Sequence, residues 1–402
     1  MAEHRLSIVD ALVFDGESEL LQEQSIHIVD DRIVQLGGAA PDHAQIVNAG
    51  GRVVTPGLID AHFHAYGIAL DLFELESTAP SFGALAASRR LSAALRRGFT
   101  TVRDVAGGDL GLRHAIERGL MTGPRYLFAG RALSQTGGHA DPRPADRHAD
   151  VCCSLVGEVV DGVDAVRAAV RERFRTGAHC IKVLASGGVV SPADPLRVPQ
   201  YSAEEIAAAV DEAARRGSYV AAHAYSPEAI LHAVENGVRS IEHGNLMDRP
   251  SAAAISMAGA YLVPTLITYD AMNRRGADVG LSEVGQEKNR EVLEAGLGSI
   301  ELARAAGVSI AFGTDLMGQL EDDQLLEFRI RCEVERPIDV LRSATSVNAD
   351  LIQRPDLGRI AEGNPADLVV FDDNPVLDPS VLWNQPARTV VSAGRIVPHG
   401  VA

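Results

Sequence analysis

The chain reads Pro56-Gly-Leu-Ile-Asp-Ala-His-Phe-His64 near its amino-terminal end, a short β-like run that closes on two histidines. Side chains alternate along a β-strand, so His62 and His64 project from the same face, two residues apart. Two imidazoles on one face suit a shared metal ion, although a pair with this spacing also arises by chance. The residues that other strands place beside this pair decide between the two interpretations.

Seven further β-like runs follow, and they alternate with helical stretches rich in alanine, glutamate and arginine. The eight runs are Leu58–His64, Thr100–Val105, Arg125–Gly130, His179–Ala185, Tyr219–Tyr225, Arg239–Gly244, Tyr261–Leu266 and Ser309–Asp315. We expect helices at Phe82–Arg97, Val163–Thr176, Ala203–Arg216, Pro227–Asn236, Arg249–Ala258 and Lys288–Ala306, and Ser202-Ala-Glu-Glu205 resembles a capping box. Eight alternations over about 290 residues predict an α/β fold, a (β/α)₈ TIM barrel. The alternative is a doubly wound open sheet, which would want a GxGxxG turn that the sequence lacks.

Both ends of the chain are rich in β-like segments. Residues 1–57 alternate apolar and polar side chains in short runs, which turn residues such as Asp15-Gly16 separate. Near the other end, Asp367–Phe371 is strongly apolar, and residues 389–397 suggest a closing hairpin. Because chain termini often lie close together, we expect residues 1–57 and 355–402 to form a composite β-sandwich domain beside a barrel of residues 58–354.

The composition narrows the class of partner. A formal net charge of −17 over 402 residues argues against a nucleic-acid or membrane surface, because both of those partners are polyanions. No stretch approaches the roughly 18 apolar residues of a membrane helix, and residues 1–10 lack the apolar core of a signal peptide. We therefore expect a cytoplasmic protein. Its four cysteines, Cys152, Cys153, Cys180 and Cys332, show no metal-binding spacing and are interpreted as free thiols.

Residues of the metal-ligand type fall in five of the eight predicted strands. These residues are His62 and His64 in the first, Lys182 in the fourth, His223 in the fifth, His243 in the sixth and Asp315 in the eighth. The carboxyl ends of barrel strands meet on one face, so these residues would lie within a few ångströms of one another. Alone, each histidine could be a hydrogen-bonded core residue, and Asp315 could be a helix N-cap. Together they predict a metal site.

Lys182 needs its own explanation, because a buried ammonium group in the apolar run Cys180–Ala185 is costly unless it is paired. The side chain could reach the barrel mouth or pair with an acid. It could also react with CO₂ to give an anionic carbamate that bridges two cations, since burial lowers the pKa of a lysine and favours the neutral amine. Two metal ions about 3.5–4 Å apart can deprotonate a bridging water and polarise a carbonyl. Asp315 would take the proton from that water and pass it to the leaving nitrogen.

These residues together resemble the amidohydrolase superfamily, and the closing Gly363-Asn-Pro-Ala-Asp-Leu-Val-Val-Phe371 is similar too. Four stretches resemble more closely the branch that contains metal-dependent Xaa-Pro dipeptidases (prolidases), related carboxypeptidases and imidazolonepropionase-like hydrolases. They are Ala132-Leu-Ser-Gln-Thr-Gly-Gly-His-Ala-Asp141, Ile181-Lys-Val-Leu-Ala-Ser-Gly-Gly188, Ala222-His-Ala-Tyr225 and Ile241-Glu-His-Gly-Asn245. The resemblance implies two divalent metal ions bridged by N-carboxylated Lys182. It also implies that His139 and Tyr225 contact the scissile carbonyl. Zinc suits these ligands best, although manganese, iron or cobalt could occupy the same set.

Three functions follow as expectations. The first is hydrolysis of an amide C–N bond in Xaa-Pro-like dipeptides or N-acyl amino acids, and the second is hydrolysis of ureido, carbamate or aryl-amide compounds such as phenylureas or ochratoxin. The third, a metal-free scaffold or binding protein, is disfavoured because all six ligand positions are filled. The loop after His139 departs from the peptidase pattern, with Ala140 where a glycine is expected and a segment Pro142–Ala149 rich in proline, arginine and aspartate. That loop leaves the substrate open.

Two expectations concern what the protein binds besides metal. Arg329 and Arg331 could bind a substrate carboxylate bidentately, but a solvated helix face or a structural ion pair is the preferred interpretation. We expect a small-molecule substrate and a homo-oligomer, since barrels of this type commonly associate.

Overall fold

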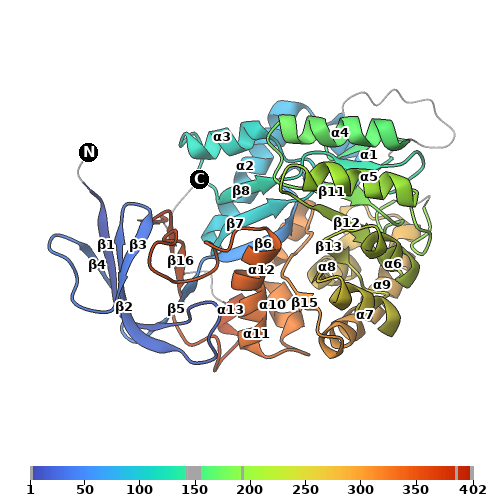
Figure 1. Ribbon diagram of the computed structural model, residues 1–402. Coiled ribbons are helices and arrows are strands. Elements are labelled where there is room, and N and C mark those ends of the chain that lie inside the picture. Colours follow the sequence, from blue (N-terminus) through green and yellow to red (C-terminus); the bar gives the residue numbers. More distant parts are fainter. Residues whose placement is uncertain (1–2, 142, 144–154, 192–193, 385–387, 399–402) are drawn as a thin grey trace.

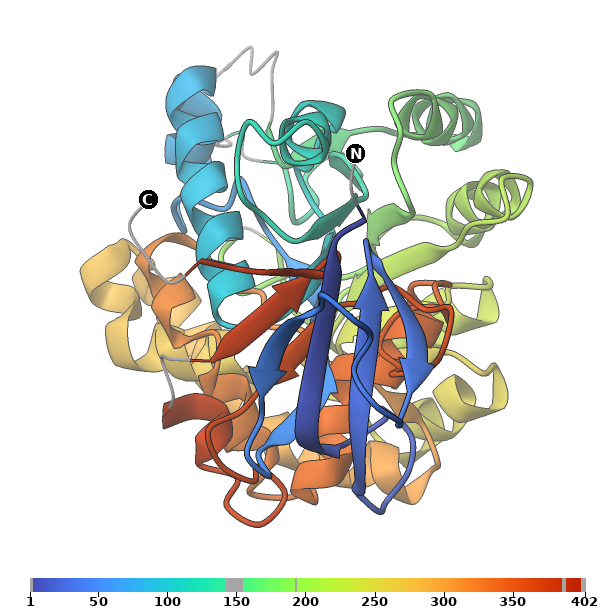
Figure 2. The same ribbon diagram turned by 90° about the vertical axis from the view of Figure 1, so that its left-hand side faces the viewer.

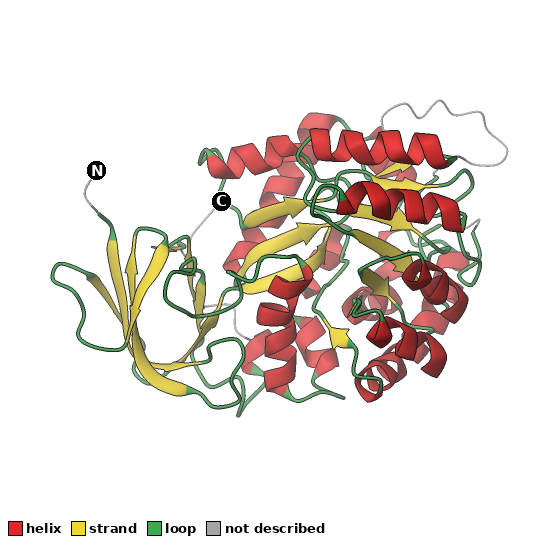
Figure 3. Ribbon diagram, in the orientation of Figure 1, coloured by secondary structure: helices red, strands yellow, loops and turns green. Residues whose placement is uncertain are grey.

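The computed structural model describes residues 3–141, 143, 155–191, 194–384 and 388–398. Figure 1 shows a barrel wrapped in helices, with a sheet from both ends of the chain at one side. Coloured by secondary structure, the strands of the barrel lie inside the helical layer, while the terminal sheet stands apart from it (Figure 3).

Eight parallel strands form the barrel, and each lies within one of the eight predicted runs, except that the second strand begins one residue before its run. They are β6 (Leu58–Phe63), β7 (Phe99–Asp104), β8 (Arg125–Phe128), β11 (Ile181–Leu184), β12 (Val220–Ala224), β13 (Ser240–His243), β14 (Tyr261–Val263) and β15 (Ser309–Ile310). The barrel closes where Ala61 N donates to Phe312 O at 2.9 Å. The predicted TIM-barrel fold is therefore confirmed.

The third barrel strand is interrupted, which the sequence did not indicate. After β8 the chain turns at Gly130, whose φ is 75°, and resumes as β9 (Ala132–Ser134). β9 pairs with β11 on one side and with β10 (Gly157–Val159) on the other. The interruption directs the loop that contains His139 over the carboxyl ends of the strands.

Helices cover the outside of the barrel. They are α1 (Leu72–Ser77), α2 (Pro80–Arg96), α3 (Leu110–Glu117), α4 (Val163–Arg175), α5 (Ala203–Ala214), α6 (Pro227–Glu235), α7 (Arg249–Met257), α8 (Leu266–Arg275) and α9 (Glu283–Ala305). The capping box predicted at Ser202 and Glu205 begins α5. α9 begins five residues before the expected Lys288, because Ser282 caps it by accepting a hydrogen bond from Gly285 N.

Short helical segments follow β15 and close the far side of the molecule. They are the 3₁₀ segment Gly318–Asp323, α10 (Leu326–Arg331), α11 (Pro337–Arg342), the π-helical turn Ser343–Val347, α12 (Asn348–Leu351) and α13 (Val381–Asn384). Apolar side chains of α10, α11 and α13 share a buried core with β6 and α2. None of the described helices is long and apolar enough to cross a bilayer.

The two ends of the chain share one mixed sheet, which faces the viewer in Figure 2. Its strands are β1 (Arg5–Val13), β2 (Gln22–Val29), β3 (Arg32–Leu36), β4 (Gln45–Asn48), β5 (Val53–Pro56), β16 (Leu368–Val370), β17 (Thr389–Ser392) and β18 (Arg395–Ile396). β5 pairs with β16, so Thr55 lies opposite Val369. The described strands form one continuous sheet around a common apolar core. The domain boundaries drawn from the sequence stay a prediction.

Gly57 joins the terminal sheet to the first barrel strand. A Cβ at this position would lie 2.0 Å from Thr100 Oγ1 in β7, so only glycine lets β5 run directly into β6. That close junction fixes where β6 begins, and therefore where His62 and His64 lie.

Candidate metal centre

One cavity at the carboxyl end of the barrel contains the predicted ligands. Its lining includes His62, His64, Lys182, His223, His243 and Asp315, together with His139 and Tyr225. The six predicted ligands come from the strands β6, β11, β12 and β13, from His64 directly after β6, and from the segment after β15.

Asp315 lies at the centre of the cluster. Its Oδ1 is 2.8 Å from His64 Nε2 and 3.3 Å from His62 Nε2, and its Oδ2 is 3.9 Å from His243 Nδ1. One ligand atom from each of His62, His243 and Asp315 can be chosen so that all three lie within 4.8 Å of one another. Burial would raise the pKa of the Asp315 carboxyl, but the histidines hold it well below its usual value. The site therefore offers an ionised carboxylate among imidazole nitrogens, which is a donor set that divalent metals bind.

Two of these residues have backbone conformations that non-glycine residues seldom adopt. φ is 53° at Asp315 and 76° at His243, in the left-handed region that costs energy for a side chain with a Cβ. The hydrogen bond from Asp315 N to His62 O, at 2.8 Å, holds the first of these turns. The turns aim both side chains into the barrel mouth.

Lys182 and His223 form the other side of the cluster. The rings of His223 and His243 have centroids 4.5 Å apart, and Lys182 is on the adjacent strand β11, paired with β12. Among the residues that the structure describes, Lys182 Nζ has no hydrogen-bond or ion-pair partner. Burial lowers its pKa to about 8, so about a tenth of it is the neutral amine at pH 7. A neutral amine beside histidines fits a lysine that reacts with CO₂ and then binds metal.

Glu242 supports the candidate site from behind His62, a role that the sequence alone did not predict. Its carboxylate is fully buried and lies 2.7 Å from His62 Nδ1 and 2.8 Å from Arg103 Nη2. Burial would raise the pKa of Glu242, but Arg103 and then His62 hold it below its usual value. His62 Nδ1–H therefore donates to Glu242, and Nε2 is left free for a metal. Arg103, a basic residue inside the predicted strand Thr100–Val105, is the signal that could have indicated a buried acidic partner.

Two tyrosines surround His243. Tyr269 Oη is 2.8 Å from His243 Nδ1 and 2.9 Å from Tyr225 Oη, and Thr265 Oγ1 is 2.9 Å from the same nitrogen. The Tyr225 ring stacks on the His243 ring at 5.1 Å. Burial raises the pKa of Tyr225 above its usual value, so the phenol stays protonated and can donate a hydrogen bond. The sequence did not predict a role for Tyr269. This residue lies on the first turns of α8, which begins three residues after β14, where the sequence predicted no helix.

The rest of the cavity wall is mostly apolar. Leu70, Val189, Val190, Met272 and Met317 line it, and Lys182 is the only lysine or arginine among the described lining residues. Arg331 is buried against Glu335 and donates to Ala311 O, and Arg329 is exposed with Asp270 3.8 Å away. Neither arginine lines the cavity. This agrees with the preferred interpretation that these arginines lie on a solvated helix face or form structural ion pairs.

Part of the loop thought to shape the substrate pocket, Pro142 and residues 144–149, lies outside the described residues, as do Cys152 and Cys153. Cys180 and Cys332 are free thiols.

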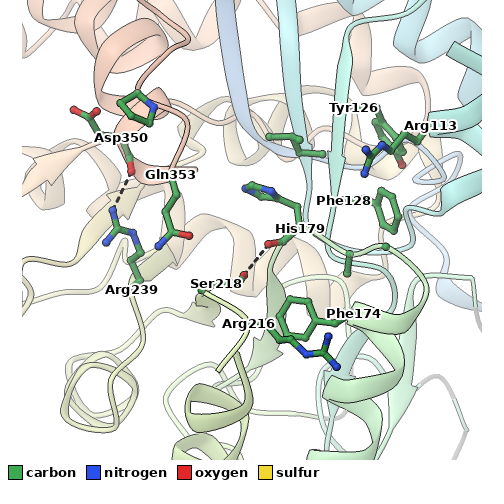
Figure 4. A pocket seen from close by; sticks show the side chains of 15 residues that line it. Arg113, Tyr126, Phe128, Phe174, His179, Arg216, Ser218, Arg239, Asp350 and Gln353 are labelled. Atoms are coloured by element: carbon green, nitrogen blue, oxygen red, sulfur yellow. Dashed lines mark hydrogen bonds between the residues drawn. The ribbon is translucent and has the colours of Figure 1, made fainter. Parts of the chain in front are cut away.

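A second concavity opens at the opposite end of the barrel strands (Figure 4). Its three arginines include Arg239, which donates to Asp350 O and Leu351 O and lies over the rings of Tyr219 and Tyr261. His179 there donates to Ile352 O. Because these groups serve packing, and barrel enzymes work at the carboxyl face, this concavity is not the candidate active site.

Comparisons with known proteins agree with the family resemblance and the fold. A sequence model described as the amidohydrolase family matches residues 53–397. The chain is 42% identical to a solved prolidase structure complexed with N-methylphosphonate-L-proline, with a TM-score of 0.96, covering 98% of this chain and all of that one. It is 31% identical to ochratoxinase of Aspergillus niger over 98% of this chain and 86% of that protein. A solved Xaa-Pro dipeptidase with bound methionine is 31% identical, with a TM-score of 0.88 and coverage of 98% and 100%.

Proposed function

This chain belongs to the amidohydrolase family, and we propose that it hydrolyses Xaa-Pro-like dipeptides or N-acyl amino acids with two divalent metal ions. The observation that carries the proposal is the meeting of four histidines, Lys182 and Asp315 in one cavity at the carboxyl end of the barrel. Family membership and the prolidase and ochratoxinase relatives support an amide hydrolase. The use of two metal ions and the choice of an Xaa-Pro-like or N-acyl substrate go beyond family membership and are part of the proposal.

The donor set is suited to hold two cations. His62, His64 and Asp315 would hold one, His223 and His243 the other, and carboxylated Lys182 would bridge them. Support for the carbamate comes from the unpaired, desolvated amine of Lys182, whose pKa is lowered to about 8, because only the neutral amine attacks CO₂. Bound metal would supply a hydroxide at neutral pH and polarise the scissile carbonyl. Zinc is the metal we expect.

The remaining steps belong to the chain's own residues. Asp315 Oδ1 faces His64 and His62 at the centre of the site, where its carboxylate can accept a proton from the attacking water and pass it to the leaving nitrogen. Glu242 keeps His62 in the tautomer that presents Nε2 to the cavity. His139 and Tyr225 lie beside the cluster, with a ring nitrogen and a protonated phenol available to the carbonyl oxygen as negative charge develops on it.

The substrate is argued from the relatives and from the wall of the cavity. The solved prolidase, 42% identical over its full length, holds an L-proline phosphonate, which favours an Xaa-Pro-like amide here. The apolar wall formed by residues such as Val189 and Met272 would take an apolar acyl group. The second candidate is an aryl or ureido amide. It is favoured by the lack of any arginine among the described lining residues and by the ochratoxinase relative.

A two-part substrate panel tests the proposal. Purified protein loaded with zinc is assayed against Xaa-Pro dipeptides and N-acyl amino acids, and in parallel against ochratoxin, phenylureas and carbamates. Asp315→Asn serves as the matched inactive control. We expect turnover in the first set that Asp315→Asn abolishes. Turnover only in the second set would contradict the proposed substrate class but not the proposed mechanism. Hydrolysis that survives in Asp315→Asn would refute the proton-transfer role of Asp315.

The oligomeric state and the cytoplasmic location stay predictions. Size measurement by light scattering tests the first.

A further inference from the structure

The ring of His139 packs tightly against two neighbours. It stacks on the His223 ring with centroids 4.5 Å apart and planes inclined by 24°. It also lies against Gly188, where a Cβ would be only 2.0 Å from His139 Cε1. A glycine is therefore needed at position 188 so that the imidazole can occupy this place.

Asp194 lies at the edge of this imidazole. Its Oδ2 is 3.4 Å from His139 Nδ1, and its side chain is 3% exposed. The same oxygen accepts from Gly188 N at 3.1 Å and from Gln200 Nε2 at 3.4 Å, while Gln200 Oε1 accepts from His139 N at 3.1 Å. Asp194 thus lies beside both Gly188 and the imidazole, whose buried Nδ1 makes no hydrogen bond to any described residue. With Nδ1 facing Asp194, Nε2 is the nitrogen turned toward the cavity that His139 lines.

Lys288 holds the backbone of the loop that contains this carboxylate. From α9, its Nζ donates to the carbonyl oxygens of Gly188, Ser191 and Asp194 at 3.0, 2.6 and 2.5 Å, and it lies 3.6 Å from Asp194 Oδ1. The lysine therefore binds the backbone at three positions within the loop that follows β11. Because α9 is a helix of 23 residues, it is a rigid support for that loop.

We infer that Asp194, clasped by Lys288, is a positioning residue that orients the His139 imidazole over the metal-ligand cluster. The inference rests on the proposed function, in which His139 contacts the scissile carbonyl. His139 comes from the turn after β9, and a histidine on a turn would otherwise sample several rotamers. A catalytic group must be held to within about 0.5 Å of its productive geometry, and the Gly188 contact, the His223 stack and Asp194 supply that restraint.

The kinetic test is a double-mutant cycle between Asp194→Ala and His139→Asn. Losing one hydrogen-bond donor at a developing oxyanion typically costs about 100-fold or more in kcat, so we expect His139→Asn to lose that much. Asp194→Ala should lower kcat at least tenfold with unchanged metal content and little change in KM. In the His139→Asn background it should cost less than twofold more, because the residue it positions is gone. Asp194→Asn, which keeps an acceptor, should recover most of the rate. Losses that multiply in the double variant would overturn the inference.

Lys288→Met has a matched control on the same helix. Glu291 pairs with Arg197 at 2.6 Å, so it also links α9 to the loop after β11, but at the exposed surface. We expect Lys288→Met to reproduce the Asp194→Ala defect and Glu291→Gln to leave kcat unchanged, since exposed ion pairs contribute little. Equal defects in both variants would show that Lys288 acts only by holding the loop to α9, without any specific effect on His139.

A crystal structure of Asp194→Ala separates this inference from the proposed function. We expect the His139 ring to leave its stack on His223, whatever the enzyme hydrolyses. A ring that stays in place overturns the positioning role even if the protein is an active prolidase. Wild-type turnover in His139→Asn would instead remove the catalytic role of His139, and a displaced ring in Asp194→Ala would still support the positioning.

Discussion

Glu242→Leu should reduce stability and metal affinity for different reasons. Glu242 and Arg103 are both fully buried and 2.8 Å apart, so the leucine leaves an uncompensated guanidinium in the barrel interior. Breaking a buried pair in this way costs about 3–5 kcal/mol of the free energy of unfolding. The leucine also removes the acceptor 2.7 Å from His62 Nδ1, and losing such a partner of a metal-binding histidine lowers metal affinity by about 10- to 100-fold.

The double variant Arg103→Met/Glu242→Leu separates the two effects. Replacing both members of a buried pair with apolar residues of similar size is often neutral, so we expect most of the lost stability to return. Metal affinity should stay low, because His62 still lacks its acceptor. Urea unfolding of metal-free protein measures the first quantity, which avoids the stabilisation that bound metal itself provides. Competition with a chromophoric chelator measures the second.

The control is Glu117→Gln, which breaks the half-exposed Arg113–Glu117 pair on α3. It should change the free energy of unfolding by less than about 0.5 kcal/mol and leave metal affinity unchanged. Wild-type metal affinity in Glu242→Leu, or recovery of affinity in the double variant, would refute the role given to Glu242.

Three further perturbations test other parts of the site and the fold. Asp315→Asn should keep its metal but lose at least about 100-fold in turnover, measured as kcat beside metal content; near-wild-type rates would rule out proton transfer by Asp315. Lys182→Ala should bind less than two metals, with partial rescue by short carboxylic acids, and full occupancy without rescue would exclude the carbamate. Burial raises the pKa of Glu327 from 4.5 to about 7, so the folded state binds this proton more tightly and the resulting stability is lost as pH rises from about 4.5 to about 7. Glu327→Gln should therefore gain up to about 3 kcal/mol relative to wild type between pH 5 and pH 8 in urea unfolding; an equal difference at both pH values would contradict this.

The barrel and the positions of the candidate metal ligands were predictable because they depend on strong local patterns. An apolar run predicts a strand. A histidine or aspartate at the end of that run places the residue at the carboxyl end of the barrel. His62, Lys182 and Asp315 therefore fell where the sequence placed them. The pairing of the two chain ends followed from their matching β-like composition, and β5 with β16 bears it out.

Residues that act through other residues were harder to predict. Glu242 is one of many acidic residues, and its role depends on Arg103 from a strand about 140 positions earlier, which only the closed barrel places beside it. Tyr269 was hidden because α8 begins where the sequence favoured a continuing strand, after a left-handed turn at Thr265. Asp194 and Lys288 are nearly 100 residues apart and meet only through the loop after β11.

The metal content of the purified protein, measured by inductively coupled plasma mass spectrometry, tests the two-metal centre most directly. We expect about two transition-metal ions per chain in wild type and a clear loss when His62 or His243 is replaced by asparagine. A protein that retains no transition metal after reconstitution, or whose bound metal is unaffected by either replacement, would contradict the two-metal site.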